Sequence, residues 1–386
     1  MHLVASERPP PDRQRRFPPR HRGVQARWAY SASNRTEPCM SSEVQASQRT
    51  HPAPRDLDWR VRIAGLGRYL PRRRVTSAEV ESMAGLPQGW ALEHSGVAFR
   101  HWADDEERAS WMGAHAARDA CQRAGIEPRE LDLIVNASGS VERSIPDGGP
   151  MLQRELGLGA SGIPSLSVHA TCLSFIAALE LAGERIHHGR IDRALLASSE
   201  IASVGLDFDS PEICSLFGDG AAAAVLERTP EGEASAIHRV AWLTMGDDVE
   251  LTTLRGGGSW RPPLGASTTA ADARFSMQGP KVLRNAMRLV PQALRRIGLD
   301  DAGARREVRW IAAHQASRAG LDYVRRLGFD KARFVSTLEN TGNCIAASIP
   351  LTIEHGVREG QIRRGEPGLL LGTGAGLSAA ALLMTY

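Results

Sequence analysis

The chain lacks several features that mark whole classes of protein. Its 386 residues contain no apolar run that approaches the roughly 20 residues a membrane-spanning helix needs. Aromatic residues make up only 5% of the chain, so aliphatic residues and alanine must form most of the core. Lysine occurs only at Lys281 and Lys331, and arginine supplies the rest of the positive charge. The 47 basic and 44 acidic residues leave a net charge of +3, too small to indicate a nucleic acid partner.

Paired cysteine spacing is also absent. The chain has an odd number of cysteines and no C-x-x-C motif, which argues against a zinc site and against a disulfide framework. We therefore expect no metal and a reducing, cytoplasmic location. One cysteine is then available for chemistry. The five are Cys39, Cys121, Cys172, Cys214 and Cys344.

Residues 1–58 differ in composition from the rest. Prolines and arginines crowd this segment, and it has neither helical nor strand periodicity, so we expect a disordered basic extension. The pair Arg15–Arg16 is followed by no apolar stretch, so it does not indicate an export signal. The segment is either a surface-binding tail or an extension without function, in which case Met40 is a candidate start.

The remaining residues predict an α/β fold. Apolar residues make up 42% and charged residues 24% of the chain, close to globular averages. Short apolar runs typical of buried strands alternate with amphipathic stretches typical of helices. Strands are expected at 61–66, 131–137, 165–169, 193–198, 221–227, 310–314, 334–337, 368–372 and 379–385, and helices at 77–84, 111–125, 173–188 and 346–358.

The order of these elements occurs twice. The strand–turn–helix unit that contains Cys172 in the first half corresponds to one that contains Asn343 in the second, about 160–180 residues later by counting along the chain. That period is too long for a solenoid, whose repeats span roughly 20–50 residues. We therefore expect two similar halves, at 59–230 and 231–386, with equivalent strand ends meeting at one central site.

Three residues at these strand ends are candidates for catalysis. Cys172 precedes a long helix, whose N-terminus should stabilise a thiolate and lower the pKa of the thiol, although a buried structural cysteine is an equal alternative. His314 ends a strand, and Asn343 lies in an Asn-Thr-Gly-Asn turn. Cysteine, histidine and asparagine together form a recurring nucleophile set, and the duplication gives them a reason to converge.

Other motifs predict no further site. Gly372, Gly374 and Gly376 lie between two strands instead of between a strand and a helix, which argues against a dinucleotide fingerprint. A close backbone approach to an active site explains these glycines better. The pair His187–His188 has no further potential ligands nearby in sequence, so it predicts no metal.

From residue 59 to the end, the chain resembles the β-ketoacyl-acyl-carrier-protein synthase III family of thiolase-fold condensing enzymes. The matching segments keep their order and spacing over this whole range. They are Ala170-Thr171-Cys172, Phe217-Gly218-Asp219-Gly220-Ala221-Ala222, His314-Gln315-Ala316, Gly342-Asn343, Ala346-Ala347-Ser348-Ile349-Pro350 and the C-terminal Gly-rich hairpin.

The resemblance implies a duplicated, five-layered αβαβα fold and a homodimer. It implies that an acyl group moves from a thioester to Cys172, with the N–H groups of Cys172 and Gly376 as the oxyanion hole. Malonyl-acyl carrier protein would then bind, and His314 and Asn343 would stabilise the enolate left by its decarboxylation. Attack of this enolate on the acyl-cysteine gives a β-ketoacyl thioester, in fatty acid or polyketide-like biosynthesis. No cofactor is implied beyond the coenzyme A or acyl carrier protein that bears each thioester.

The resemblance also implies roles around the catalytic residues. Substrate-binding positions are Trp90, Ile145, Leu216, Gly279, Leu283 and Ser317, with Ile145 crossing the dimer interface to line the partner's acyl pocket. Arg284, Arg325 and Arg326 correspond to positions where the acidic carrier protein docks, although a solvated helix face is an equal alternative.

Some positions depart from the family pattern. His94 and Pro211 replace the arginine pair at the coenzyme A entrance, and a long loop at 256–269 suggests a modified substrate entrance. The C-terminal hairpin lacks the second cysteine of a thiolase, and Ile145 replaces the glutamate of head-to-head condensing relatives. An acyltransferase that passes the acyl group from Cys172 to an alcohol or amine is the alternative. Retention of Asn343 favours condensation over that alternative, and the intact triad argues against a non-catalytic subunit.

Overall fold

The computed structural model describes residues 56–386. The expectation about residues 1–58 therefore lies outside the described residues, apart from the last three. Within residues 56–386, none of the helices combines the length and the apolar character needed to cross a bilayer.

The first half forms a five-stranded sheet. Its strand order is β1-β7-β6-β4-β5, with β4 parallel to β5 and β6, and β7 antiparallel to β6 and β1. The runs LIVN of β4 and GAAAAV of β7 are buried, as expected for strands covered on both faces. The strands are β1 (Val61–Tyr69), β4 (Leu133–Asn136), β5 (Ser165–Ser167), β6 (Arg193–Glu200) and β7 (Gly220–Arg228).

The second half repeats this sheet strand for strand. Its order is β8-β14-β13-β11-β12, with the same parallel and antiparallel pairs at equivalent places. This shared topology is what the repeated order of elements in the sequence predicted. The strands are β8 (Ala236–Thr244), β11 (Trp310–Ala313), β12 (Arg333–Val335), β13 (Pro367–Gly374) and β14 (Ser378–Thr385).

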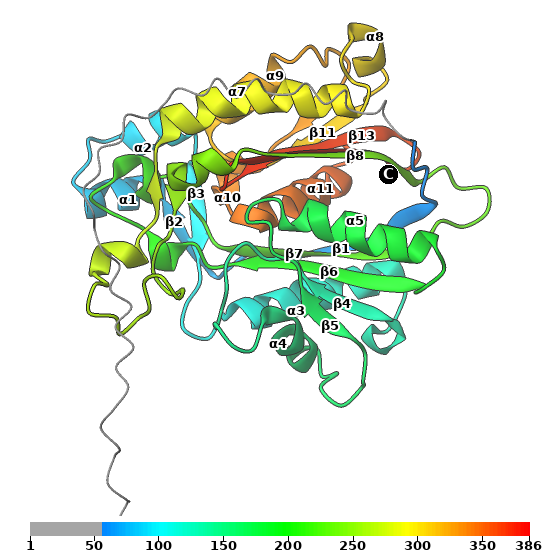
Figure 1. The fold of residues 1–386 in the computed structure, drawn as a ribbon, viewed down its shortest axis with the longest axis horizontal. Coiled ribbons are helices and arrows are strands. Elements are labelled where there is room, and N and C mark those ends of the chain that lie inside the picture. Colours follow the sequence, from blue (N-terminus) through cyan, green and yellow to red (C-terminus); the bar gives the residue numbers. More distant parts are fainter. Residues whose placement is uncertain (1–55) are drawn as a thin grey trace, which may run out of the picture. The chain divides into compact units, whose positions relative to one another are not determined.

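Helices complete five layers, as Figure 1 shows. Helices α5 (Ser174–His187) and α11 (Ser348–Arg358) lie between the two sheets. The outer face of the first sheet is covered by α3 (Ala109–Ala124) and α4 (Gly148–Glu155), and that of the second by α7 (Gly279–Arg296) and α9 (Arg318–Arg325). The αβαβα arrangement expected for the thiolase fold is therefore present.

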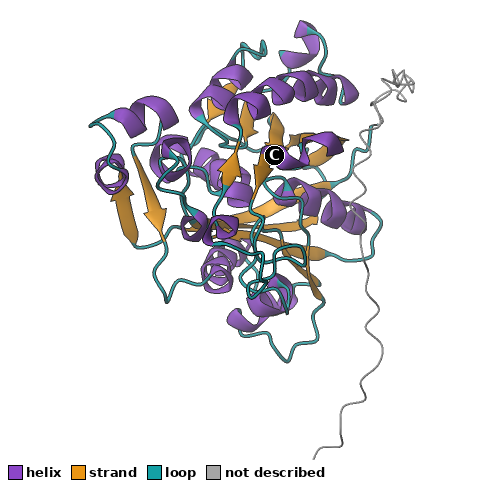
Figure 2. Ribbon diagram, turned by 60° about the vertical axis from the view of Figure 1, so that its left-hand side comes forward, coloured by secondary structure: helices purple, strands orange, loops and turns teal. Residues whose placement is uncertain are grey.

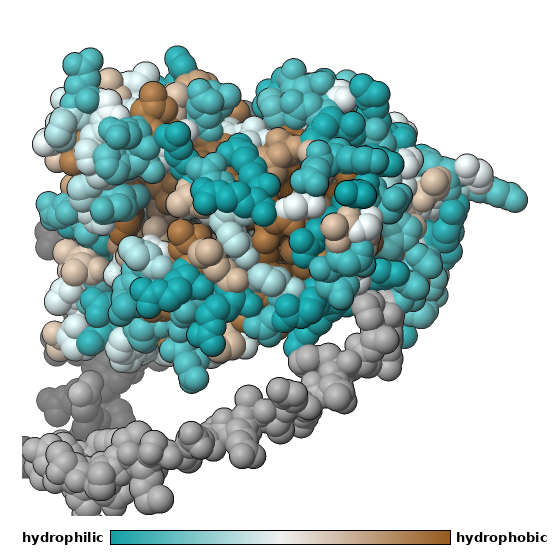
Figure 3. Space-filling view, turned by 90° about the horizontal axis from the view of Figure 1, so that it is seen from above, coloured by the Kyte–Doolittle hydropathy of each residue, from teal (hydrophilic) through white to brown (hydrophobic). Residues whose placement is uncertain are grey.

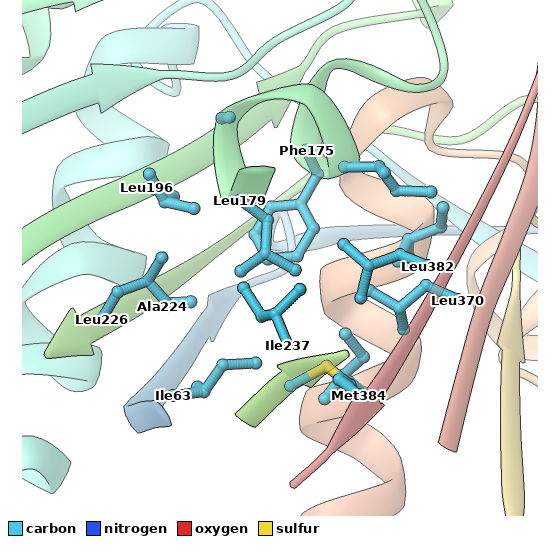
Figure 4. Packing of buried hydrophobic residues seen from close by; sticks show 14 of the residues in the cluster. Ile63, Phe175, Leu179, Leu196, Ala224, Leu226, Ile237, Leu370, Leu382 and Met384 are labelled. Atoms are coloured by element: carbon cyan, nitrogen blue, oxygen red, sulfur yellow. The ribbon is translucent and has the colours of Figure 1, made fainter. Parts of the chain in front are cut away.

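The central layer is the most apolar part of the molecule. Phe175, Leu179 and Ile186 of α5 have no exposed surface and pack against residues of both sheets (Figure 4). Leu226 belongs to the first sheet and Leu382 to the second, and both lie in this same cluster. Since burying a large aliphatic side chain stabilises the fold by about 1.5–3 kcal/mol, this cluster holds the two halves together.

The remaining elements surround the two sheets. In Figure 2 a pair of strands stands apart from the large sheets, with helices beside it; these strands are β2 and β3. The smaller elements are β2 (Arg73–Thr76), α1 (Ser77–Ala84), α2 (Trp90–Ser95), β3 (Phe99–Trp102), η1 (Pro128–Glu130), η2 (Ser203–Gly205), α6 (Pro211–Cys214), η3 (Gly246–Leu251), β9 (Thr252–Thr253), η4 (Ala270–Ala273), β10 (Ser276–Met277), α8 (Ala302–Arg305), α10 (Leu338–Thr341) and η5 (Ile345–Ala347).

Most predicted elements lie within a few residues of the observed ones. The helix expected at 77–84 has those bounds, but its N-cap is Thr76, one residue before its first residue Ser77. The Thr76 side chain accepts from the Glu79 N–H, and Glu79 returns the contact as a capping box. The helix expected at 346–358 begins as the 3₁₀ turn η5 and becomes α-helical at Ser348.

The central layer can be tested by truncating one side chain. We expect Leu179→Ala to lower the free energy of unfolding by about 2–5 kcal/mol, because it leaves a cavity between the two sheets. The matched control is Leu92→Ala on α2, where the side chain is 46% exposed and the loss should be below about 0.5 kcal/mol. Denaturant unfolding measures both variants, and similar losses would contradict the assignment of the core.

Candidate active site

Cys172 lies in a short turn between a strand and a helix. The turn Ala170-Thr171-Cys172 follows β5 and leads into α5, as the sequence pattern predicted. Thr171 has φ +51°, a left-handed conformation that is uncommon for residues other than glycine. The turn directs a half-buried Cys172 to the N-terminal end of the central helix.

The environment of the Cys172 thiol differs from the expectation. Burial, and next the negative charge of Glu200, raise the pKa of this thiol to about 12. The N–H groups of Cys172 and Ala375 oppose this effect and lower the pKa. The predicted lowering of the pKa by the helix N-terminus is therefore outweighed, and the resting side chain is a neutral thiol at physiological pH.

Two backbone N–H groups face the sulfur of Cys172. One belongs to Cys172 and the other to Ala375, in the turn between β13 and β14. The expected second donor was Gly376, the next residue, which has φ +122°. The left-handed backbone at Gly376 shapes the turn, while Ala375 supplies the N–H group beside the thiol.

His314 follows the last residue of β11. Its N–H donates to the Leu371 carbonyl at 2.8 Å, which continues the β11–β13 pairing and fixes the backbone. Burial lowers the pKa of the imidazole to about 4, so the ring is neutral at physiological pH. Its Nδ1 atom is buried and has no hydrogen-bond partner within the described part of the chain.

Asn343 is held by contacts on both sides of its amide. Nδ2 donates to the Ala316 carbonyl at 3.4 Å, two residues after His314. Oδ1 accepts from the Ile345 N–H at 2.9 Å, at the start of η5. The Asn343 N–H donates to the Leu216 carbonyl at 2.9 Å, so the turn is anchored on the first half.

Glycines bring the three segments together. A Cβ atom at Gly372 would lie 2.8 Å from Leu173 Cδ2 and 3.0 Å from His314 Cβ, and one at Gly374 would lie 2.6 Å from Thr171 Oγ1. The end of β13 therefore fits against the Cys172 turn and His314 because Gly372 and Gly374 have no side chain. This is the close backbone approach that the sequence predicted for these glycines.

An apolar pocket leads to His314. It runs between α7, α9 and the ends of β11 and β13, and four of the expected residues line it. Seen from the side of α7 and α9, hydrophobic residues show among hydrophilic ones (Figure 3). Leu216 is buried in a core cluster and is not among the lining residues. The expected residues in the lining are Gly279, Leu283, Ser317 and His314.

The other expected positions lie away from this pocket. Trp90 stacks on His94 with ring centroids 4.1 Å apart, so one face of the indole is covered by its own helix. Ile145 is 88% exposed, on the loop between β4 and α4. Arg284, Arg325 and Arg326 are exposed on or just after α7 and α9, and Arg325 also pairs with Asp322 at 2.8 Å.

Sequence reasoning missed three residues that shape the site. Ala375 supplies an N–H group, which every residue type except proline does, so no side-chain signal marked it. Gln315 accepts from the Thr337 and Leu338 N–H groups at 3.1 and 3.0 Å and thereby fixes the segment that leads to Asn343. Glu200 ends a strand that otherwise reads as an ordinary buried run. A carboxylate at a buried strand end was the only available signal for it.

Comparison with known proteins identifies the family. The family model for 3-oxoacyl-[acyl-carrier-protein] synthase III matches residues 166–246, and that for its C-terminal part matches 299–386. β-Ketoacyl-[acyl-carrier-protein] synthase III of Neisseria meningitidis is 32% identical over 327 residues, which cover 84% of this chain and 99% of the relative.

Solved structures agree with this relationship. 3-Oxoacyl-[acyl-carrier-protein] synthase III from Aquifex aeolicus superposes with a TM-score of 0.73 and 28% identity, covering 84% of this chain and all of that one. The priming β-ketosynthase of the R1128 polyketide pathway gives a TM-score of 0.74 at 28% identity over 86% of this chain and 98% of that one. The chain therefore belongs to the β-ketoacyl-[acyl-carrier-protein] synthase III family of acyl-transferring condensing enzymes.

Proposed function

We propose that this enzyme joins an acyl group to a malonyl unit by decarboxylative Claisen condensation, with Cys172, His314 and Asn343 as its catalytic residues. The observation that carries the proposal is that the Cys172 turn and His314 both meet the glycines of β13, at the end of an apolar pocket that His314 lines. Asn343 is tied to Ala316, two residues after His314. The product, a β-ketoacyl thioester, would enter fatty acid or polyketide-like biosynthesis. We expect the reaction to take place in the cytoplasm.

In the first half-reaction the acyl group moves to the enzyme. The Cys172 sulfur attacks the thioester carbonyl, a new C–S bond forms, and the donor leaves as a free thiol that takes the proton. Negative charge gathers on the carbonyl oxygen during this step. The N–H groups of Cys172 and Ala375 point to the same spot and would donate to that oxygen.

In the second half-reaction malonyl-acyl carrier protein loses CO₂. The electron pair of the broken C–C bond becomes an enolate, whose oxygen accepts hydrogen bonds from His314 and Asn343. A neutral imidazole is a donor, and the low pKa of His314 keeps the ring neutral. The enolate then attacks the acyl carbon, the bond to the Cys172 sulfur breaks, and the sulfur recovers a proton. Because loss of CO₂ generates the carbanion, the step needs hydrogen-bond donors instead of a strong base.

The alternative is acyl transfer from Cys172 to an alcohol or amine. That reaction shares only its first half-reaction, the acylation of Cys172, with condensation. Its second step needs a base to deprotonate the acceptor. The placement of Asn343 favours condensation, since its amide is tied to Ala316, close in sequence to His314. An amide cannot act as a base, whereas it can donate to an enolate oxygen.

We further propose that the acyl carrier protein docks on the surface of α7 and α9. Arg284 and Arg326 are exposed there and, within residues 56–386, neither forms an ion pair with an acidic side chain. Both lie on elements that line or flank the pocket that ends at His314. An acidic carrier would therefore bring its thioester arm to the mouth of the pocket, and no further cofactor is needed.

The second partner that we propose is another copy of this chain, in a homodimer. Strand β5 is an outer strand of the first sheet, and an outer strand offers unpaired backbone groups to another chain. Ile145 and Val141, on the loop between β4 and α4, are 88% and 73% exposed. Two copies joined through this edge would cover these side chains, which agrees with the role that the family resemblance gives to Ile145.

The nucleophile can be tested by mass spectrometry of the intact protein. Incubated with a panel of acyl-coenzyme A and acyl-carrier-protein thioesters, the enzyme should gain one acyl group on Cys172, and malonyl carrier protein should then discharge it as a β-ketoacyl thioester. Cys172→Ala should not load, whereas the control Cys121→Ala, which removes a buried cysteine of α3, should load normally. Loading of Cys172→Ala would contradict the assignment. Loading that malonate does not discharge would favour the acyltransferase.

His314 and Asn343, which would donate hydrogen bonds to the enolate oxygen, should affect the second half-reaction most. We expect Asn343→Ala to slow malonyl decarboxylation by about 10²-fold or more, the typical effect of losing an oxyanion donor, with a smaller effect on loading. Equal losses in both steps would make Asn343 structural.

The pH profile of decarboxylation tests the state of His314. With a pKa of about 4, His314 should stay neutral, and the rate should not fall between pH 7 and pH 5.5. An ordinary histidine, with a pKa near 6.5, would lose most of its neutral form over this range. A fall in rate with a midpoint near pH 6.5, absent from the loading step, would contradict a neutral buried His314.

The docking surface can be tested by charge reversal. We expect the pair Arg284→Glu and Arg326→Glu to raise KM for malonyl-acyl carrier protein by about tenfold and to weaken the dependence of KM on salt, with kcat little changed. The control is Arg190→Glu, an exposed arginine beyond the far end of α5. Equal effects in the control and in the pair would place the carrier protein elsewhere.

A further inference from the structure

Glu200 is a buried carboxylate that accepts hydrogen bonds from two segments around the candidate active site, Gly139–Ser140 and Ala346. It is the last residue of β6 and has no exposed surface. Its Oε1 accepts from the Gly139 N–H at 2.5 Å, and its Oε2 accepts from the Ser140 N–H at 2.9 Å and from the Ser140 hydroxyl. The Ala346 N–H, in η5 of the second half, is a fourth donor. A carboxylate removed from water needs such a set of donors, and these four come from both halves of the molecule.

We propose that Glu200 is a positioning residue, whose carboxylate holds η5, and with it Asn343, in place against the turn that carries Cys172. The inference rests on the proposed function, because it assigns Glu200 a part in aligning the two half-reactions. It adds a residue that does not touch the substrate and acts through those that do.

The contacts around Gly139 show how the alignment works. A Cβ atom at Gly139 would lie 2.7 Å from Ile345 Cγ2 and 2.8 Å from the Thr171 carbonyl oxygen. The Gly139–Ser140 turn therefore packs between Thr171, the residue before Cys172, and Ile345 of η5. Ile345, in turn, donates its N–H to Asn343 Oδ1 at 2.9 Å. By fixing Gly139, Ser140 and Ala346 at once, Glu200 sets the spacing between Cys172 and Asn343.

Two strained residues lie within this arrangement. Thr171 has φ +51° and Ile345 has φ +47°, and both are β-branched, for which the left-handed region is unfavourable. Such conformations persist only where surrounding contacts hold them. The Glu200 hydrogen bonds act on the turn that touches both residues, so losing them should allow the Cys172 turn and η5 to relax away from the reactive geometry.

The charge of Glu200 also affects the pKa of the Cys172 thiol. After burial, it is the largest cause that raises the pKa of Cys172. The pKa of the Cys344 thiol, just before η5, is raised by burial, next by Asp219 and to a smaller extent by Glu200. Burial raises the pKa of Glu200 itself to about 8, against the lowering effect of its four donors. The titratable groups near this carboxylate are Cys172 just before α5, Cys344, and His169, whose ring contacts the Gly139 carbonyl at 3.1 Å.

The experiment compares Glu200→Gln and Glu200→Asp with Glu81→Gln. Glu81 is a matched control, because it is also a buried carboxylate that accepts from two backbone N–H groups, of Gly89 and Ala91 at 3.0 and 2.9 Å, within α1 and α2. Three quantities are measured in the full-length enzyme: the rate of Cys172 alkylation by iodoacetamide against pH, the rate of acyl loading, and the rate of malonyl decarboxylation.

We expect Glu200→Gln to raise the alkylation rate of Cys172 several-fold at about pH 9.5, where Glu200 with its pKa of about 8 is ionised, because the thiolate then no longer faces a buried negative charge. The same variant should slow decarboxylation by about tenfold or more relative to loading, because Asn343 is no longer aligned. Glu200→Asp keeps the charge, so its alkylation profile should stay close to that of the wild type while decarboxylation falls. Glu81→Gln should change none of the three quantities.

An alkylation profile of Glu200→Gln identical to that of the wild type, with an unchanged ratio of decarboxylation to loading, would overturn the proposal. If Glu200→Gln does not fold, Ser140→Ala removes one donor and keeps the carboxylate; it should shift the same ratio in the same direction by a smaller factor, and an unchanged ratio would likewise overturn it. If the wild type loads but does not condense, the proposed function fails, whereas the alkylation arm still tests Glu200.

Discussion

The active site depends on a backbone contact that leaves no room for side chains. Strand β13 approaches the Cys172 turn and His314 so closely that a Cβ atom at Gly372 or Gly374 would lie within 2.8 Å of an atom in that turn or in the first residue after it. The two sheets stand apart, separated by α5 and α11, so this is where the halves come into contact at the reacting atoms. Side chains at these two positions would therefore push β13 away from the Cys172 turn and from His314.

Much of this arrangement could be predicted because it depends on periodic patterns. Buried strands and amphipathic helices repeat in the same order, and a repeat of that length implies two equivalent sheets. The candidate residues at the strand ends follow from that repeat, since equivalent ends of duplicated halves meet at the centre. Two of the differences concern single hydrogen bonds: the helix at 77–84 is capped by Thr76, the residue before it, and the N–H group beside the thiol is that of Ala375 instead of Gly376. Which N–H group makes such a contact depends on the backbone angles of the turn. The hydrophobic pattern does not encode these angles, so it can place the contact one residue away from its true position.

The state of the nucleophile was mispredicted for a different reason. A helix N-terminus favours an anion by about 0.3–1 kcal/mol, which lowers a pKa by less than one unit. Burial acts in the opposite direction and, with the charge of Glu200, leaves the pKa of Cys172 at about 12 instead of 9.0. The helix is visible in the sequence, whereas the depth of the thiol and the carboxylate beside it depend on residues far away in the chain. Burial therefore changes the thiol pKa more than the helix does, and it cannot be predicted from the residues next to Cys172 in the sequence.

The three residues proposed for catalysis share one property: each is uncharged in the resting enzyme. Cys172 is a thiol, His314 is a neutral imidazole, and Asn343 carries no charge at any pH. A site of this kind does not hold a base strong enough to remove a proton from carbon, but decarboxylation generates the carbanion without one. What the site must provide is hydrogen-bond donors in the correct place when charge develops on oxygen. The hydrogen bonds of Glu200 and Gln315 and the close approach of the β13 glycines fix the segments that carry Cys172, His314 and Asn343.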